Sequence, residues 1–107
     1  MKLLHVTVHS EYADAVVEML EAHGIERYVH YPRMRGRDSD GRHDGSKTFP
    51  GDISVLQAEV DEEQVDALFD ALSEFRGAKR AHQHLQALVL SVHRSLVNED
   101  EPDSDHE

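Results

Sequence analysis

Hydrophobic residues alternate with more polar ones in several short segments of the chain, which is the pattern of β-strands with one buried face. In the first segment Leu4, Val6 and Val8 occupy every second position. The second segment is short and rich in β-formers, and we expect Pro32 to end it because proline cannot donate to a strand ladder. The predicted strands cover residues 2–9, 27–31, 53–60 and 85–92.

Hydrophobic residues at helical spacing follow the first and the third of these strands. Ser10 is in position to cap the first helix at its N-terminus, and Gly24 is placed as its C-terminal cap. Asp61 and Gln64 form a capping box for the second helix, which we expect Gly77 to end. The apolar faces of the two helices comprise Ala13, Val16, Val17 and Leu20, and Val65, Leu68, Phe69, Leu72 and Phe75.

The order of these elements is βαββαβ, which predicts an α+β, ferredoxin-like fold. In that plan a four-stranded antiparallel sheet carries two helices on one face. The last predicted strand, however, is apolar on both of its faces. Because two helices cover only one face of the sheet, we expect self-association to cover the other.

Composition and charge place the chain among small acidic proteins. Its 107 residues suffice for one domain and carry a formal net charge of -11, with 38% hydrophobic residues. This acidity argues against nucleic acid or an anionic lipid surface as the main partner. The chain contains no cysteine, which excludes disulfides and thiolate chemistry. With no run of 18 apolar residues and no signal-peptide pattern at its start, a cytoplasmic protein is the expectation.

Much of the negative charge lies at the C-terminus. Residues 95–107 contain six acidic residues and no Lys or Arg, so residues 1–94 carry -11 + 6 = -5. Such a segment buries too little apolar surface to offset its ordering entropy, and we expect a disordered tail after a domain at residues 1–94. A solubilising role for this tail is favoured over the capture of metal ions or a basic partner.

A long polar segment, residues 33–52, separates the second and third predicted strands. Loops of this length are uncommon in small domains and are usually functional or disordered. The segment contains five basic residues, which are Arg33, Arg35, Arg37, Arg42 and Lys47. This cluster is consistent with contacts to phosphates or to an acidic partner surface, and equally with a solvated loop.

The βαββαβ plan, the long loop and the run GSKTFPGD at residues 45–52 together resemble the PII-like proteins, small trimeric relatives of the nitrogen-regulatory PII signal transducers. The resemblance covers about residues 1–94, and Phe49 and Pro50 belong to its motif. It implies a homotrimer whose sheets face the threefold axis, with small effectors bound in clefts between subunits. The long loop would then contact the downstream partner.

The same resemblance points to adenine nucleotides as effectors, with one departure from the PII pattern. PII proteins hold nucleotide phosphates with a Gly-Asp-Gly-Lys segment after the second helix, where this chain reads RGAKRAHQH, residues 76–84. Two bases in this position also suit the C-terminal end of a helix dipole. The effector site expected from the resemblance comprises Gly45, Ser46, Gly51, Gly77, Lys79 and Arg80.

The chain has 9 histidines, and four of them form a second candidate site. If the first and last strands are antiparallel neighbours, the end of one meets the beginning of the other, and His9 approaches His82 or His84. Imidazoles bind Zn, Cu, Ni or Co, although a histidine near a strand end is more often an ordinary polar residue. Some PII-like proteins are associated with heavy-metal efflux, so the predicted partners include a membrane transporter or a metal efflux pump. The candidate ligands are His5, His9, His82 and His84.

No pattern of catalytic residues is present, because the chain lacks a nucleophile elbow, a P-loop and a cysteine nucleophile. Two hypotheses follow. The preferred one is a non-enzymatic regulator that binds a small effector between subunits and signals through residues 33–52. The alternative is a protein or sensor that binds divalent metals through histidines near the sheet.

Overall fold

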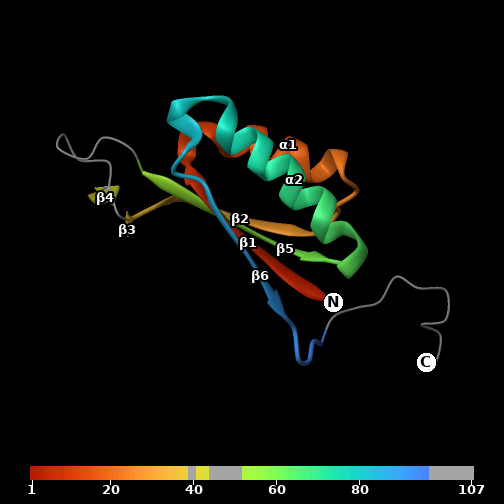
Figure 1. Cartoon of the computed structure of the whole chain (residues 1–107). Coiled ribbons are helices and arrows are strands. Elements are labelled where there is room, and N and C mark those ends of the chain that lie inside the picture. The colour runs from red at the N-terminus through yellow and green to blue at the C-terminus, as the bar shows by residue number, and fades with distance from the viewer. Residues whose placement is uncertain (39–40, 44–51, 97–107) are drawn as a thin grey trace, which may run out of the picture.

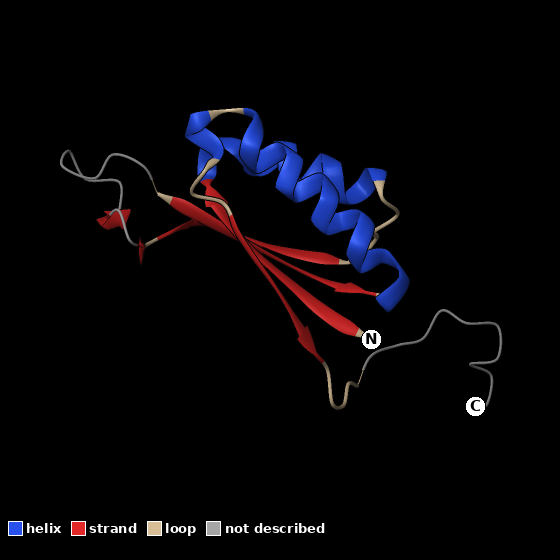
Figure 2. Ribbon diagram, in the orientation of Figure 1, coloured by secondary structure: helices blue, strands red, loops and turns tan. Residues whose placement is uncertain are grey.

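The computed structural model describes residues 1–38, 41–43 and 52–96, and Figure 1 shows their arrangement. A four-stranded antiparallel sheet carries two helices on one face (Figure 2), which confirms the predicted ferredoxin-like α+β fold. Single 3-10 turns follow β1 and α2. The elements of this body are β1 (Lys2–His9), η1 (Ser10–Tyr12), α1 (Ala13–Ala22), β2 (Tyr28–Met34), β5 (Ile53–Val60), α2 (Glu62–Ala78), η2 (Arg80–His82) and β6 (Gln86–Ser91).

The strands lie in the order β2-β5-β1-β6, so β2 and β6 form the edges of the sheet. The long strands β1 and β5 pair from Lys2 opposite Val60 to His9 opposite Ile53. On its other side β1 pairs antiparallel with β6, which confirms that the first and last strands are neighbours.

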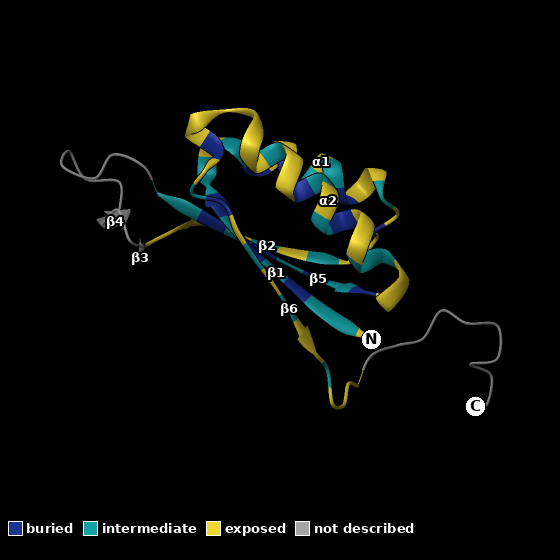
Figure 3. Ribbon diagram, viewed as in Figure 1, coloured by how far each residue is buried: buried dark blue, intermediate teal, exposed yellow. Residues whose placement is uncertain are grey.

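The core lies between the sheet and the two helices, as the buried segments in Figure 3 show. Leu4, Val6 and Val8 are at most 1% exposed, so the alternation in β1 directs these three side chains inward. The predicted helix faces supply Val16, Leu20, Leu68 and Leu72 to the same core. In this layer, apolar side chains at every second position of the strands pack against apolar side chains spaced about 3.6 residues apart on the helices.

The first helix begins later than predicted. Ser10 is not its N-cap, because η1 intervenes and the side-chain oxygen of Ser10 hydrogen-bonds that of Ser54 at 2.9 Å. The end of the helix is as predicted. Gly24 has φ +84°, its N–H donates to the Glu21 carbonyl, and the Ile25 N–H donates to the Leu20 carbonyl, which together form a Schellman motif.

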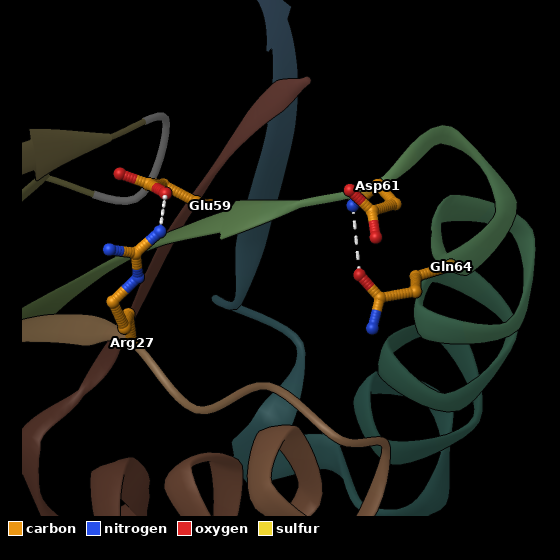
Figure 4. Close-up of polar contacts among 4 residues, drawn as sticks. All are labelled: Arg27, Glu59, Asp61 and Gln64. Carbon is orange, nitrogen blue, oxygen red and sulfur yellow. Dashed lines mark hydrogen bonds and ion pairs between the residues drawn. The ribbon is translucent and has the colours of Figure 1, made fainter. Parts of the chain in front are cut away.

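The second helix has the predicted start and a different end. The Asp61–Gln64 capping box is present, and the Asp61 N–H donates to Gln64 Oε1 at 2.8 Å (Figure 4). Gly77 does not end this helix, which runs to Ala78 and stops at Lys79, whose φ of -142° is extended. The prediction relied on the left-handed conformation that glycine adopts at helix ends, and Gly77 does not adopt it.

Pro32 does not end the second strand, which continues to Met34 with a shift of register between Tyr31 and Met34. Within this irregularity Arg33 has φ +56°. A bulge on an edge strand tolerates proline because the missing N–H needs no ladder partner.

The expectation that residues 33–52 lack regular structure is also wrong in part. Two short strands, β3 (Gly36–Asp38) and β4 (Gly41–His43), pair antiparallel within this segment, and Arg37 lies opposite Arg42. They form a separate two-stranded sheet beyond the end of the main one (Figure 1). Residues 39–40 and 44–51 lie outside the described part of the chain.

The face of the sheet opposite the helices is rich in exposed apolar side chains, as predicted. On β6, Leu88 is 57% and Leu90 49% exposed, and they lie opposite His5 and Leu3 of β1. Val29 and Tyr31 of β2 are also exposed on this face. At one corner Arg27 Nη2 donates to Glu59 Oε1 at 2.9 Å (Figure 4).

None of the helices in the described residues combines the length and the hydropathy needed to cross a bilayer. Most of the predicted acidic tail, residues 95–107, lies outside the described residues; Leu96, within them, is fully exposed.

Candidate functional site

The ends of four strands meet at one end of the sheet, and this end carries the candidate site. Because neighbouring strands are antiparallel, β1 and β2 end where β5 and β6 begin. The long loop therefore leaves and re-enters the sheet at the same end as the turn that connects α2 to β6 (Figure 1). We call this the loop end of the sheet.

Backbone and side-chain contacts link the base of the loop to the α2–β6 turn across β1. The Ser10 N–H donates to the Asp52 carbonyl at 3.0 Å, which joins the return of the loop to the end of β1. On the other side of β1 the rings of His9 and His84 stack, with centroids 4.6 Å apart and 16° between their planes. These contacts connect the base of the loop, the end of β1 and the α2–β6 turn across the loop end.

The α2–β6 turn presents two of the predicted phosphate-binding residues to solvent. Lys79 and Arg80 both have exposed side chains, and they follow the last turn of α2 directly. Gly77 lies just before them in the last turn of the helix, and nothing lies within 4 Å of the position where its Cβ would be. The turn is therefore accessible and positively charged on an otherwise acidic chain.

The base of the loop contains a further positive charge. Arg33 Nη1 lies 4.0 Å from Asp52 Oδ2, so this ion pair connects the two ends of the loop. The Arg33 side chain is 84% exposed, and such a pair contributes little stability on its own. Arg35 is also exposed. The side chains of Arg37 and Arg42 are not described, and Lys47, Gly45, Ser46 and Gly51 lie outside the described residues.

The predicted histidine cluster is only partly present. His9 meets His84 as expected, but His5 faces the open side of the sheet, where Gln57 Nε2 donates to its Nδ1 at 3.2 Å. His82 is 7% exposed and points into an aromatic environment next to Phe75. Within residues 1–38, 41–43 and 52–96, no three His, Asp or Glu side chains gather closely enough to hold a metal ion.

Two structural roles in the turn escaped the sequence patterns. Arg76 Nε donates to the Leu85 carbonyl at 2.8 Å, which ties the last turn of α2 to the start of β6. His82 Nδ1 lies 2.9 Å from the Phe75 carbonyl oxygen. Neither bond has a local sequence signal, because each joins residues brought together by the reversal of the chain.

Hydrogen bonds to carboxylates raise the pKa of two tyrosines. A hydrogen bond to Glu11 raises the pKa of Tyr12, which lies beside His82, above its usual value. Tyr28 Oη donates to Glu21 Oε2 at 3.0 Å, and this bond raises the pKa of Tyr28 in the same way.

Hollows on the described surface adjoin both sides of the sheet. One of about 400 Å³ lies between α2 and β6 and is lined by Phe69, Leu72 and Arg76 among others. The other, of about 430 Å³, lies beside the Arg27–Glu59 pair at the far end of the sheet. The first of them reaches Leu88 on the open face.

No protein-family model matches this sequence, and no curated protein matches it significantly. The fold, in contrast, has clear counterparts among solved structures. CPII from Thiomonas intermedia K12, a nitrogen regulatory PII-like protein whose crystals contain ADP, AMP and bicarbonate, superposes with a TM-score of 0.68 at 20% identity. That match covers 83% of this chain and 88% of CPII.

Two further structures agree. The apo form of CPII superposes with a TM-score of 0.62 at 18% identity, over 88% of this chain and 92% of the other. A PII-like signalling protein of Thermus thermophilus superposes with a TM-score of 0.62 at 22% identity, over 82% of each chain. The predicted resemblance is thereby confirmed at the level of structure: this chain has the fold of the PII-like proteins.

Proposed function

We propose that this protein is a non-enzymatic regulator that assembles as a homotrimer and binds an adenine nucleotide between its subunits. The observation that carries the proposal is the combination of a PII-like fold with an exposed, basic turn at the loop end of the sheet. CPII, which shares the fold at 20% identity, holds ADP and AMP in its crystals.

The open face of the sheet supports self-association. Leu88 and Leu90 on one edge strand are about half exposed, and Val29 and Tyr31 are exposed on the other edge strand. Apolar patches of this kind on small proteins usually mark interaction sites. In a trimer closed around these faces, each loop end would border a neighbouring subunit.

The α2–β6 turn supports the choice of a phosphate-bearing ligand. Lys79 and Arg80 bring two positive charges and several N–H donors to one short exposed segment. The loop residues Gly45, Ser46 and Gly51 are proposed to complete the site, on the strength of the resemblance described above. A bound nucleotide would order the loop, and the ordered loop would present its arginines to the downstream partner.

Isothermal titration calorimetry with ATP, ADP and AMP tests the nucleotide site. We expect binding to weaken at least about ten-fold in Lys79→Ala and in Arg80→Ala, because each loses a charge-assisted contact to phosphate. Arg94→Ala is the matched control, since Arg94 is exposed and lies beyond the opposite end of β6. Equal nucleotide affinities in all three variants would contradict the proposal that Lys79 and Arg80 form the binding site. If the unchanged protein bound none of the three nucleotides, the proposal of an adenine nucleotide as the ligand would be wrong.

The alternative, a metal-binding protein, is tested by the same titrations with Zn and Cu. Two of its candidate ligands, His9 and His84, are in contact, but their rings stack and do not direct two nitrogen lone pairs at one point. Metal binding that is lost in both His9→Ala and His84→Ala would support this alternative, since these are the two candidate ligands in contact. A membrane transporter or efflux pump as the downstream partner stays a prediction.

A further inference from the structure

His82 is a buried polar residue in a turn whose other residues are mostly exposed. The residue is 7% exposed, whereas Lys79, Arg80 and Gln83 lie at the surface. A buried imidazole needs a hydrogen-bond partner, because leaving it unpaired costs free energy. His82 therefore has a structural reason to point inward that its neighbours lack.

The partner of His82 is the end of the preceding helix. Nδ1 lies 2.9 Å from the carbonyl oxygen of Phe75, one of the last four carbonyls of α2. A carbonyl only accepts, so Nδ1 carries the hydrogen and donates it. The side chain of His82 thus caps the C-terminal end of α2 from a position seven residues further along the chain.

Two aromatic rings hold the imidazole in place. The ring of Phe75 stacks on it with centroids 4.0 Å apart and 4° between the planes. Tyr12 of η1 contacts it edge-on, with centroids 4.6 Å apart and 68° between the planes. Because η1 follows β1 directly, these contacts also anchor the turn to the end of β1, one of the two inner strands.

Backbone hydrogen bonds connect the anchored His82 to the two basic residues of the turn. The His82 N–H donates to the Lys79 carbonyl at 3.0 Å, and the Gln83 N–H donates to the Arg80 carbonyl at 3.1 Å. The Leu85 N–H returns to the His82 carbonyl at 3.1 Å. Lys79 and Arg80 therefore form the outer surface of a turn whose inner side is attached through His82.

We propose that His82 is a positioning residue for phosphate recognition, which holds Lys79 and Arg80 in a fixed, binding-competent arrangement. This inference rests on the proposed nucleotide site. It also assigns His82 a role other than the metal ligation predicted from the sequence. A preorganised turn binds more tightly because fewer side-chain and backbone states are lost on binding.

Two substitutions of His82 test its hydrogen-bond donor and its aromatic ring separately. His82→Phe keeps an aromatic ring between Phe75 and Tyr12 but cannot donate to the Phe75 carbonyl. His82→Asn loses the ring and keeps an N–H donor at about the same distance from the backbone. We expect ADP affinity to fall about five- to ten-fold in His82→Phe and to be largely retained in His82→Asn. His93→Phe, at a histidine beyond the other end of β6, is the matched control.

Nitrogen-15 NMR of the imidazoles provides a readout that does not depend on nucleotide. We expect His82 to show a protonated Nδ1 at neutral pH, and a tautomer protonated only at Nε2 would overturn the proposal even if a variant failed to fold. Unchanged ADP affinity in a folded His82→Phe protein would overturn it as well. A third outcome is that the unchanged protein does not bind ADP although Nδ1 is protonated. The nucleotide proposal then fails, and so does the positioning role of His82, which in that case only caps the helix.

Discussion

The imidazole of His9 stacks on that of His84, so the end of β1 contacts the entry to β6 through two side chains 75 positions apart. The ring centroids are 4.6 Å apart. This pair crosses the loop end of the sheet, between the base of the long loop and the α2–β6 turn. Its first consequence is for the stability of that region.

We expect His9→Ala and His84→Ala each to lower the free energy of unfolding, with a coupling energy of about 0.5–1.5 kcal/mol at neutral pH. The reason is that either substitution removes the same ring-to-ring contact. Urea unfolding of the two single variants and the double variant measures the coupling. His93→Ala provides the control at a histidine beyond the far end of β6, and strictly additive effects of His9→Ala and His84→Ala would argue against the contact.

A charge on the open face of the sheet should disrupt self-association. Burial of a leucine side chain stabilises an interface by about 1.5–3 kcal/mol, and an aspartate in its place would be desolvated without a partner. We therefore expect Leu88→Asp to sediment as a smaller species than the unchanged protein. Ala15→Asp adds the same charge to an exposed position of α1 and should leave sedimentation unchanged. A lone subunit for the unchanged protein would refute the assembly itself.

Two glycines are expected to respond in opposite directions to the same substitution. Gly24 has φ +84°, and Gly24→Ala should destabilise the protein by about 1–2 kcal/mol, because a Cβ disfavours the left-handed conformation. Gly77 lies within α2 with open space around it, so Gly77→Ala should stabilise by up to about 1 kcal/mol. Thermal unfolding followed by circular dichroism compares them. A loss of stability in Gly77→Ala would contradict its helical, unobstructed position.

The hydrogen bond from Tyr28 to Glu21 predicts a shifted titration. Glu21 raises the pKa of Tyr28 above 10.0, so the bond contributes stability below that value and loses it as the pH rises through the raised pKa. Glu21→Gln should lower the pKa of Tyr28 toward the ordinary value, which ultraviolet titration of the phenolate would detect. Glu18→Gln, on the same helix, is the control. Identical titration curves for all three proteins would show that the bond is not formed in solution.

Much of the fold was predictable from local patterns. The alternation in residues 2–9 and 53–60 matches β1 and β5 at both ends, because a strand with one buried face needs an apolar residue at every second position. The capping box of Asp61 and Gln64 is equally local, since both partners lie within one helical turn. The apolar residues on both faces of β6 predicted an apolar open face, where Leu88 and Leu90 are exposed, and its cover by self-association stays a prediction.

Local patterns were least reliable where a residue has several possible roles. Ser10, Pro32 and Gly77 are all typical boundary residues, and none acts as the expected boundary here. In each case a contact or conformation outside the local motif prevails: Ser10 binds Ser54, Pro32 lies in a bulge on an edge strand, and Gly77 keeps helical geometry. The pairing of β3 with β4 had no clear signal in a segment so rich in glycine and charge.

The sequence alone was enough to predict the four strands of the main sheet, the two helices and their apolar faces, and the basic residues in the long loop and after the second helix. The choice between His82 and His84 as the partner of His9 depended on the folded structure, in which His84 meets His9 and His82 turns inward against Phe75. The physical reason is that periodicity and caps act over a few residues. Contacts between distant side chains depend instead on strand order and register, which the burial of the whole core establishes.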